Sequence, residues 1–420
     1  MRRTAPEIIE VDEKRFEEML QRAEAGAFTQ EDYQTVSKLI QSYAHLTGLI
    51  GDKKYDATAA SMIALLKYGS GMPFNRVEGL QGGVGVPLAA STQWEIVNAC
   101  GTTIQPAFVE LIDQAAQGDV LHNDDTTVKI LEFMGKRRQR WLRAQRSNEN
   151  AAESSTSERT GLFTSGIVAI REGHTIALFF SGHQHAGENL KDVLAKRAAE
   201  LAAPIQMCDG LSRNLPGELE TIVANCLAHG RRKFVDVVDS FPEECRYVLE
   251  SLKKVYHNDE LARVEDLTPA ARLELHQTQS GPVMESLHRW LTRQLDDHLV
   301  EPNSSLGQAI NYLLKRWEKL TLFLREPGAP LDNNICERAL KKAILHRRNS
   351  LFYRSANGAR VGNLFMSLIY TCQLCDANPL DYLTELQRHA EELAADPQRW
   401  MPWNYRETLD GIPMPAEAAC

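Results

Sequence analysis

The sequence predicts an α/β protein, in which a mixed β-sheet with flanking helices is interrupted by an all-α insertion and preceded by a helical N-terminal region. Two observations lead to this prediction. Between about residues 118 and 230, short apolar runs bounded by turn residues alternate with a helical pattern. From about residue 231 to 330 the pattern is purely helical, with long amphipathic runs such as 283–298 and 306–324.

The N-terminal region predicts helices in two parts, residues 1–54 and 55–117. In the first part, apolar residues recur at helical spacing. In the second part, two short helices flank the glycine-rich turn 81–87, and a further helix begins near residue 91. This second part is either an αα-hairpin or a helix-turn-helix unit that reads DNA.

The sheet domain begins at about residue 118, and its first part extends to residue 230. Apolar runs bounded by turn residues predict five strands, with a helix at 187–200 between the third and the fourth. The predicted strands are 119–124, 162–170, 175–181, 204–209 and 220–226, and the last of these is either a strand or a helix. Residues 171–174 predict a hairpin turn, so the first three strands form a meander that continues into a parallel part.

A long polar segment separates the first two strands. Residues 136–143 are basic and contain Trp141, which either stacks on an exposed base or anchors the segment to the domain. Residues 147–157 are rich in Ser, Asn, Glu and Ala, a composition typical of mobile chain.

The sheet domain resumes after the insertion, at residues 331–375. Glu337 lies on the expected first turn of a helix, and seven Lys or Arg residues follow it up to Arg360 without an intervening acid. Beyond that helix we expect a helix at 361–374 packed on the sheet and, in the C-terminal part 376–420, a helix at 380–394 followed by irregular chain.

Composition and charge restrict the function. The chain has 420 residues, of which 25% are charged and 43% hydrophobic, as in globular proteins of several domains. Its net charge of −9 argues against coating nucleic acid with the whole surface, but it is compatible with a local basic site. The eight cysteines are scattered, and we find no signal peptide or membrane-spanning run, so we expect a reduced, cytoplasmic protein.

Acidic residues at the predicted strand ends indicate a metal site. Asp124 or Asp125 ends the first strand and Asp209 ends the fourth, and the carboxyl ends of strands meet in an open α/β sheet. Glu337 can join them from its helix start. Three converging carboxylates repel one another, which raises their pKa values unless cations compensate. Two Mg²⁺ ions held by Asp and Glu oxygens are the usual solution, and they suit displacement reactions at phosphorus.

The chain resembles the insertion-sequence-66 family of DDE transposases over about residues 55–390. Two long and specific segments and two short ones carry the resemblance. They are Cys226-Leu-Ala-His-Gly-Arg-Arg-Lys-Phe234, Pro330-Leu-Asp-Asn-Asn-Ile-Cys-Glu-Arg-Ala-Leu340 with its continuation at 357–367, Leu121-His-Asn-Asp-Asp-Thr126 and Gln206-Met-Cys-Asp-Gly210.

The resemblance implies a ribonuclease-H-like catalytic domain with a helical insertion before the final Glu. By motif, the acidic triad is Asp124, Asp209 and Glu337, which would hold two Mg²⁺ ions, with Mn²⁺ as a substitute. The resemblance also implies a bacterial, nucleoid-associated enzyme that cuts transposon ends and joins them to double-stranded target DNA. A homodimer assembled on DNA and accessory proteins encoded by the same element are the further partners to expect.

The sequence departs from the family pattern in two places. The first site reads Asp124-Asp125-Thr126 where the family usually has Asp-Glu-Thr. Side chains alternate along a strand, so only one of the two aspartates faces the metals, and the motif position favours Asp124. The paired cysteines of an N-terminal zinc-binding module are missing, since Cys100 is the only cysteine before Cys208. Two further hypotheses are therefore an inactive or truncated remnant that only binds DNA or self-associates, and a nuclease that cuts without joining.

Two groups of basic residues are candidate phosphate contacts, and the alternative for both is a solvated helix face. The candidates are Arg231, Arg232 and Lys233 after the first cysteine motif, and Arg338, Lys341, Lys342, Arg347 and Arg348 after Glu337.

Three Cys or His pairs have the spacing of metal ligands. Cys226 and His229 make an incomplete tetrahedral zinc site, and the preferred interpretation is a structural role where the sheet meets the insertion. The Cys372–Cys375 pair lies in an apolar run and is interpreted as core. The His183–His185 pair lies in a predicted turn and is interpreted as incidental.

Overall fold

The structure of the protein is a computed structural model that describes residues 55–83, 85, 87–137, 139 and 159–411, together with the single residues Arg22 and Thr29. Contacts divide the chain into two units, Met1–Ala60 and Ser61–Cys420. The sheet, the insertion and the candidate site all belong to the second unit. The helices expected in 1–54, Trp141 and most of the polar segment around it, and residues 412–420 lie outside the described residues.

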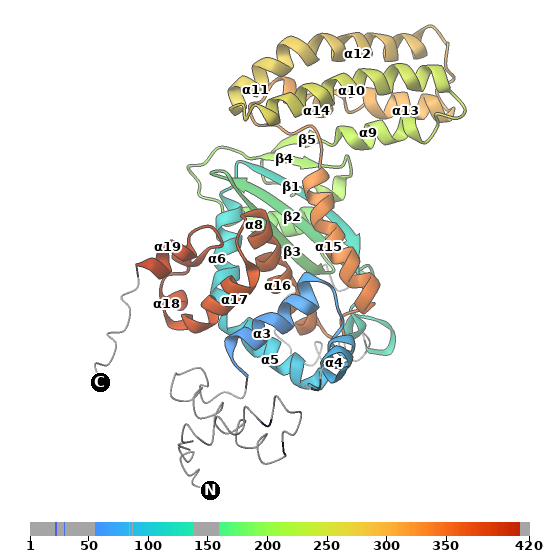
Figure 1. The fold of residues 1–420 in the computed structure, drawn as a ribbon. Coiled ribbons are helices and arrows are strands. Elements are labelled where there is room, and N and C mark those ends of the chain that lie inside the picture. The colour runs from blue at the N-terminus through green and yellow to red at the C-terminus, as the bar shows by residue number, and fades with distance from the viewer. Residues whose placement is uncertain are drawn as a thin grey trace. The chain divides into compact units, whose positions relative to one another are not determined.

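One five-stranded mixed sheet forms the centre of the second unit (Figure 1). The strand order is β3-β2-β1-β4-β5; β1, β2 and β3 are antiparallel neighbours, whereas β1, β4 and β5 run parallel. The strands are β1 (Val120–Thr127), β2 (Phe163–Arg171), β3 (His174–Gly182), β4 (Ile205–Cys208) and β5 (Ile222–Asn225). This arrangement is ribonuclease-H-like, so the predicted fold class is confirmed.

The strands lie where the apolar runs predict them. The fifth, for which a helix was the alternative, is a strand. β2 and β3 are joined by the two-residue turn Glu172–Gly173, whose φ angles are 49° and 81°. A turn with two positive φ values twists in the same sense as the flanking strands, so it closes the tight hairpin that the sequence predicts.

Helix α16 (Ala356–Leu374) covers the free edge of β3 and confirms the helix expected at 361–374. The backbone N–H of Ala177 donates to the Thr371 hydroxyl at 3.1 Å, and that of Phe179 donates to the Ser367 hydroxyl at 2.9 Å. An uncovered edge strand would expose these donors to other chains. The two hydroxyls therefore dock the helix and satisfy the edge at the same time.

Two helices cover β1 and β2 from opposite sides of the sheet. Helix α15 (Asn334–Ser350) packs on the face that carries the proposed metal site, and α8 (Ala186–Leu194) packs on the other. Gly166 of β2 permits the close approach of α15, because a Cβ atom at this position would lie 3.0 Å from the Leu340 side chain. The helix predicted at 187–200 is wrong in its second half, since α8 ends at Leu194.

The region before the sheet is helical, as predicted. Its helices are α3 (Ala57–Ala64), α4 (Phe74–Gly83), α5 (Ala90–Thr103) and α6 (Gln105–Ala116). Helices α4 and α5 are joined by hydrogen bonds from the Ala90 N–H to Glu78 at 3.1 Å and from the Gln93 amide to Gln81 at 3.2 Å. Whether this pair reads DNA or is a plain αα-hairpin stays a prediction.

The all-α insertion follows β5 and ends before α15. It contains α9 (Leu227–Val235), α10 (Pro242–Val264), α11 (Pro269–Leu275), α12 (Gly281–Asp296), α13 (Ser305–Leu314) and α14 (Trp317–Leu320). The run expected as one helix at 306–324 is thus interrupted after Leu314. Figure 1 shows these helices gathered beyond the β4–β5 side of the sheet.

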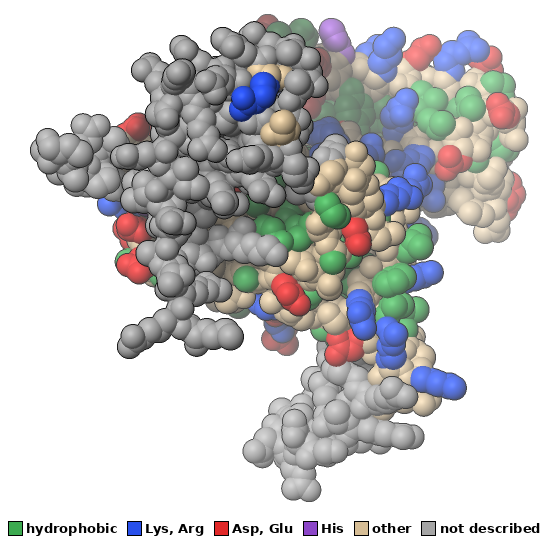
Figure 2. Space-filling model, turned by 60° about the horizontal axis from the view of Figure 1, so that its bottom comes forward, with side chains coloured by type: hydrophobic (Ala, Val, Ile, Leu, Met, Phe, Trp, Pro, Cys, Tyr) green, Lys and Arg blue, Asp and Glu red, His purple; other side chains and the backbone are tan. Residues whose placement is uncertain are grey.

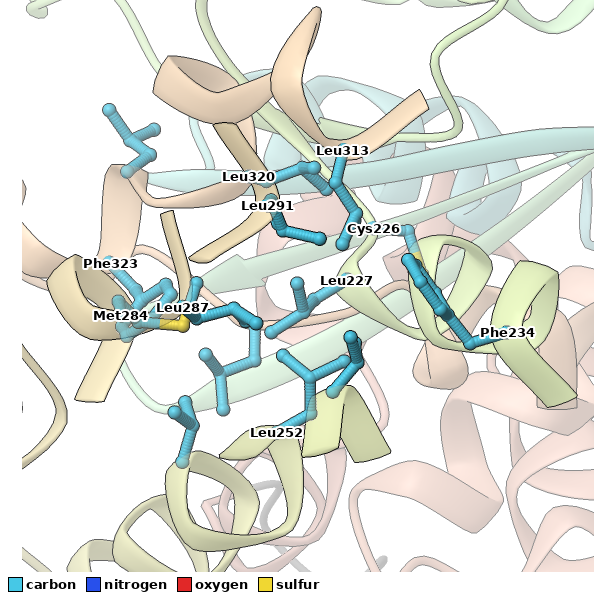
Figure 3. Close-up of a cluster of buried hydrophobic side chains, with 14 of the residues drawn as sticks. Cys226, Leu227, Phe234, Leu252, Met284, Leu287, Leu291, Leu313, Leu320 and Phe323 are labelled. Atoms are coloured by element: carbon cyan, nitrogen blue, oxygen red, sulfur yellow. The ribbon is translucent and has the colours of Figure 1, made fainter. Parts of the chain in front are cut away.

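The insertion shares one hydrophobic core with the sheet. Met207 of β4 and Ala224 of β5 belong to the same buried cluster as Leu252, Leu287 and Leu313 of the insertion helices. Figure 3 shows these insertion side chains converging with Cys226 and Leu227 at the start of α9. Because close-packed apolar contacts tolerate little displacement, this core holds α9 and α10 at a fixed position beside the strand ends.

The C-terminal part differs from its prediction. The helix expected at 380–394 is two helices, α17 (Pro379–Arg388) and α18 (Ala390–Ala395), and irregular chain is wrong for α19 (Tyr405–Asp410). The Tyr382 and Tyr405 rings meet edge to face at 5.1 Å, and the Tyr382 hydroxyl donates to the Trp400 carbonyl at 2.8 Å. These tertiary contacts order a segment whose composition alone favours irregular chain. Across the described residues, no helix combines the length and the apolar character needed to cross a membrane.

Candidate active site

The two aspartates lie within β1, which continues to Thr127, so the expectation that one of them ends this strand is wrong. They face opposite sides of the sheet. Asp125 is 3% exposed; its carboxylate is 2.7 Å from His185 Nδ1 and 3.6 Å from a nitrogen of Arg213. His185 also caps α8, where its N–H donates to Glu188 at 2.8 Å. The interpretation of His185 as incidental is therefore wrong: its ring holds Asp125, which makes Asp125 part of the structural framework on the α8 face.

Asp124 projects on the α15 face toward other acids. Its Oδ1 accepts the N–H of Asp125 at 2.8 Å. Burial raises the pKa of Asp124 to about 6, and the negative charges of Asp209 and Asp125 add to this increase, while His229 opposes it. A carboxyl group that is partly buried among like charges is poised to bind a cation.

Asp209 comes directly after β4, the parallel neighbour of β1, and the register of the two strands brings it beside Asp124. The Asn214 amide and the Leu211 N–H both donate to Asp209 Oδ1, the second at 3.2 Å. Gly210 leaves room for Arg316, because a Cβ atom there would collide with the Arg316 side chain. Arg316, from the junction of α13 and α14, thus brings a positive charge beside Asp209, which no pattern in the sequence indicates.

Glu337 lies on the first turn of α15, as the sequence predicts. Its Oε1 is 3.8 Å from His229 Nε2, and its Oε2 is 3.9 Å from a nitrogen of Arg232. Glu337 Oε1 and His229 Nδ1 are buried and have no hydrogen-bond partner. Burial raises the pKa of the Cys336 thiol, and the charges of Asp124 and Glu337 add to this increase.

A buried amide network positions these acids. Asn333, at the N-terminus of α15, lies 3.1 Å from His122 Nδ1 and donates to the Asn123 carbonyl at 3.1 Å. The Gln206 amide donates to Asn123 at 2.9 Å and to the Asn214 carbonyl at 2.7 Å. All five side chains are nearly or fully buried. The network therefore links β1, β4, the loop after Asp209 and the start of α15 into one unit.

His229 and Cys226 lie at the start of α9, where the sheet meets the insertion. Cys226, His229 and Glu337 offer ligand atoms within 4.8 Å of one another. The Cys226 sulfur accepts the Asn333 N–H at 3.3 Å, and burial raises the pKa of its thiol to about 11. Its burial at this junction fits a structural role, and its place in the group with His229 and Glu337 fits a metal ligand, so the role of Cys226 stays a prediction. His229 faces the acids.

The basic candidates divide into exposed and engaged side chains. Arg347 donates to the Thr126 hydroxyl at 3.2 Å and to Thr127, so it fastens α15 to the end of β1. Lys342 lies over the Tyr370 ring at 5.4 Å, and Lys233 over the Tyr312 ring at 5.8 Å. Lys233 is exposed all the same, and the other exposed candidates are Arg231, Arg232, Arg338, Lys341 and Arg348. In the view of Figure 2, Lys and Arg side chains gather mainly on the right-hand side of the described surface, with Asp and Glu among them.

The Cys372–Cys375 pair belongs to α16 and its end. Cys372 is fully buried, and the Cys375 thiol donates to the Thr175 carbonyl at 3.6 Å. The seven cysteines of the described residues are free. The interpretation of Cys372 and Cys375 as core residues fits this environment.

The fold and these contacts define a ribonuclease-H-like protein with an all-α insertion between β5 and α15. Residues 53–361 match the family described as the transposase IS66 family, which is well over half of the chain. The chain therefore belongs to the IS66 family of transposases.

Its relatives include three uncharacterized proteins of Sinorhizobium fredii (strain NBRC 101917 / NGR234). The protein y4qI is 29% identical over 357 residues, 83% of this chain, and y4hP is 26% identical over 357 residues, 81% of this chain. The protein y4jD is 32% identical over 188 residues, 44% of this chain and 36% of its own length. The chain spans 62% of the length of y4qI and 60% of that of y4hP.

Proposed function

We propose that this chain cuts and transfers DNA strands by phosphoryl transfer at Asp124, Asp209 and Glu337. One observation carries the proposal: the partly buried Asp124 carboxyl has a pKa raised to about 6 beside Asp209, within reach of the His229 charge, and His229 in turn contacts Glu337. The buried, unpartnered Glu337 Oε1 adds to it. Acids placed together in this way need cations, and their oxygen atoms fit Mg²⁺ or Mn²⁺.

The three carboxylates would hold two Mg²⁺ ions, for which Mn²⁺ would substitute. When bound, such ions lower the pKa of an attacking water or 3′-hydroxyl and neutralise charge at the phosphorus. The remaining work belongs to the chain's own side chains. The Asn214 amide fixes the orientation of the Asp209 carboxylate. Arg232, which lies near Glu337, and Arg316, which lies against Gly210, would supply positive charge for the phosphate.

The substrate that we propose is double-stranded DNA, as transposon ends and as target. The partners are those of the family resemblance: a second copy of the chain on paired DNA ends, and accessory proteins of the same element. The exposed Arg231, Arg338, Lys341 and Arg348 would contact phosphates, which supplies affinity without sequence information. The contacts of Arg347 with Thr126 and Thr127 give it a positioning role in addition.

The test is incubation of the protein with Mg²⁺ or Mn²⁺ and labelled duplexes that carry the end repeats of the element. We expect cleavage and strand transfer by the wild type, and loss of both with retained DNA binding for Asp209→Ala and Glu337→Gln. Glu318→Gln, an exposed acid of α14, is the control and should cut normally. Cleavage by either triad variant would remove that residue from the mechanism.

The same assay separates the alternatives. Cutting without joining would identify a nuclease, and DNA binding without cutting by the wild type would identify a remnant that only binds DNA. Each of these outcomes contradicts the transposase proposal for this chain.

A further inference from the structure

The insertion carries a large groove next to the proposed active site. Its cavity volume is about 940 Å³, and it lies between α9 and α10. One end is formed by Arg232, which is also 3.9 Å from Glu337, and by Asn334, the first residue of α15. Since α9 and α10 share the buried core with β4 and β5, the groove has a fixed position relative to the acids.

The walls of the groove are basic. Arg231 and Arg232 line it from α9, and Arg246 and Lys253 line it from α10. Among the described lining residues, the one acid is Glu250. Arg246 also pairs with Glu243 at 2.9 Å, but both side chains are more than half exposed, so water screens this pair. The walls therefore retain an excess of positive charge that favours an anionic ligand.

Apolar side chains also line the groove, and we call this part of the lining its apolar floor. It consists of Val235, Val238, Leu249 and the ring of Tyr256, and Val235 is 41% exposed. A duplex presents mainly phosphates to a basic surface and would leave such a floor in contact with water. An unpaired nucleotide combines an anionic phosphate with a flat, weakly polar base, so it matches both the walls and the floor.

We propose that this groove binds unpaired nucleotides of the DNA strand whose phosphate lies at Asp124, Asp209 and Glu337. The proposal rests on the proposed function, because that function places a DNA strand at the end of the groove that Arg232 forms. It assigns Arg246, Lys253 and the apolar floor to DNA binding, a role that the sequence alone does not indicate. Arg231 and Arg232 then contact phosphates between the groove and the acids.

The first experiment compares two double variants that remove equal charge from α10. Arg246→Ala with Lys253→Ala alters the groove, whereas Arg263→Ala with Lys254→Ala alters exposed residues outside it. Arg263 matches Arg246, because each pairs with a glutamate three positions earlier on the same helix.

Affinity is measured by fluorescence anisotropy in EDTA, with a labelled duplex that ends in a short unpaired tail and with the same duplex blunt-ended. For the groove variant we expect affinity for the tailed DNA to fall on the order of tenfold and its salt slope to fall by about two, with less than about twofold change on blunt DNA. The control variant should bind both DNAs as the wild type does.

A second variant tests the apolar floor. Val235 is partly exposed, so the Val235→Gln variant should fold, and this substitution leaves the charge of the groove unchanged. We expect weaker binding of the tailed DNA with an unchanged salt slope. Equal losses on tailed and blunt DNA for the groove variant would reduce the groove to a plain basic surface, and unchanged binding of both DNAs would overturn the proposal.

The experiments can refute the groove proposal and the proposed function separately. Tailed-DNA binding that depends on the groove, in a protein that cuts no DNA, would keep the groove proposal and refute the proposed function. Normal cutting and normal tailed-DNA binding by the groove variant would keep the proposed function and refute the groove proposal.

Discussion

Replacing Asp124 with asparagine should stabilise the protein in the absence of metal. Burial and the charges of Asp209 and Asp125 raise the pKa of Asp124 to about 6, against an ordinary value of 3.8. The folded protein therefore resists ionisation of this carboxyl group more than the unfolded chain does. Asparagine has nearly the same shape, can still accept the Asp125 N–H, and carries no charge.

The size and the sign of the effect follow from linkage. Well below the ordinary pKa of 3.8 the carboxyl group is protonated in both states, so the charge contributes nothing to stability. Between about pH 4 and 6 the unfolded chain loses its proton first, and the wild type loses stability as the pH rises. Above pH 6 the full cost applies, which is about 3 kcal/mol for a shift of this size.

The measurement is urea unfolding of wild type and Asp124→Asn from pH 4 to 8 in EDTA. The difference in free energy of unfolding should grow in favour of the variant by about 2 kcal/mol between pH 4 and pH 7. Saturating Mg²⁺ should reduce this difference, because a bound cation stabilises the ionised wild type. Asp125→Asn is the matched control: it removes the contacts with His185 and Arg213, so it should lower stability.

A pH-independent difference between wild type and Asp124→Asn would refute the reasoning. So would stabilisation by Asp125→Asn of the same size. The first result would mean that the Asp124 carboxylate has an ordinary pKa, and the second that Asp125 is no better compensated than Asp124. Either would remove the electrostatic argument for a metal at Asp124.

The remaining predictions concern the neighbours of the acids. Arg347→Ala should lower stability by about 1–3 kcal/mol in thermal unfolding, because a charged donor to Thr127 is lost; an unchanged melting temperature would contradict this. Asn333→Ala should cost about 2 kcal/mol by leaving the Asn123 carbonyl without its donor, and a neutral effect would argue against the buried network. His229→Ala should reduce metal affinity, read by calorimetry, on the order of tenfold, and unchanged affinity would exclude His229 from the site.

The strands and the order of the elements were predictable because local signals determine them. Apolar runs bounded by glycine and other turn residues give the five strands, and the Glu172–Gly173 pair supplies the conformation that a tight hairpin needs. The insertion was predictable for the same reason: amphipathic periodicity is a property of neighbouring residues. The prediction of irregular chain near the C-terminus failed because α19 is ordered by its contact with Tyr382. No local sequence pattern encodes that contact.

The side-chain partners within the candidate site were not predictable from local pattern. His185 meets Asp125, Arg347 meets Thr127 and Arg316 meets Gly210 only because the fold brings distant segments together. In sequence, each of these basic residues looks like a turn or surface residue. The family resemblance indicates which acids to compare, but it does not indicate what neutralises each of them.

The two aspartates of β1 illustrate this difference best. Strand alternation requires Asp124 and Asp125 to face opposite sides of the sheet, but alternation alone does not say which of them lacks a positively charged side chain as a partner. The fold supplies His185 and Arg213 to Asp125, and it supplies acids to Asp124. A protein selected only for stability would reverse that choice or replace Asp124, because an uncompensated buried charge lowers the free energy of unfolding. The raised pKa of Asp124, one residue away from an aspartate that has cationic partners, is therefore the physical reason why we assign Asp124 rather than Asp125 to the proposed metal site.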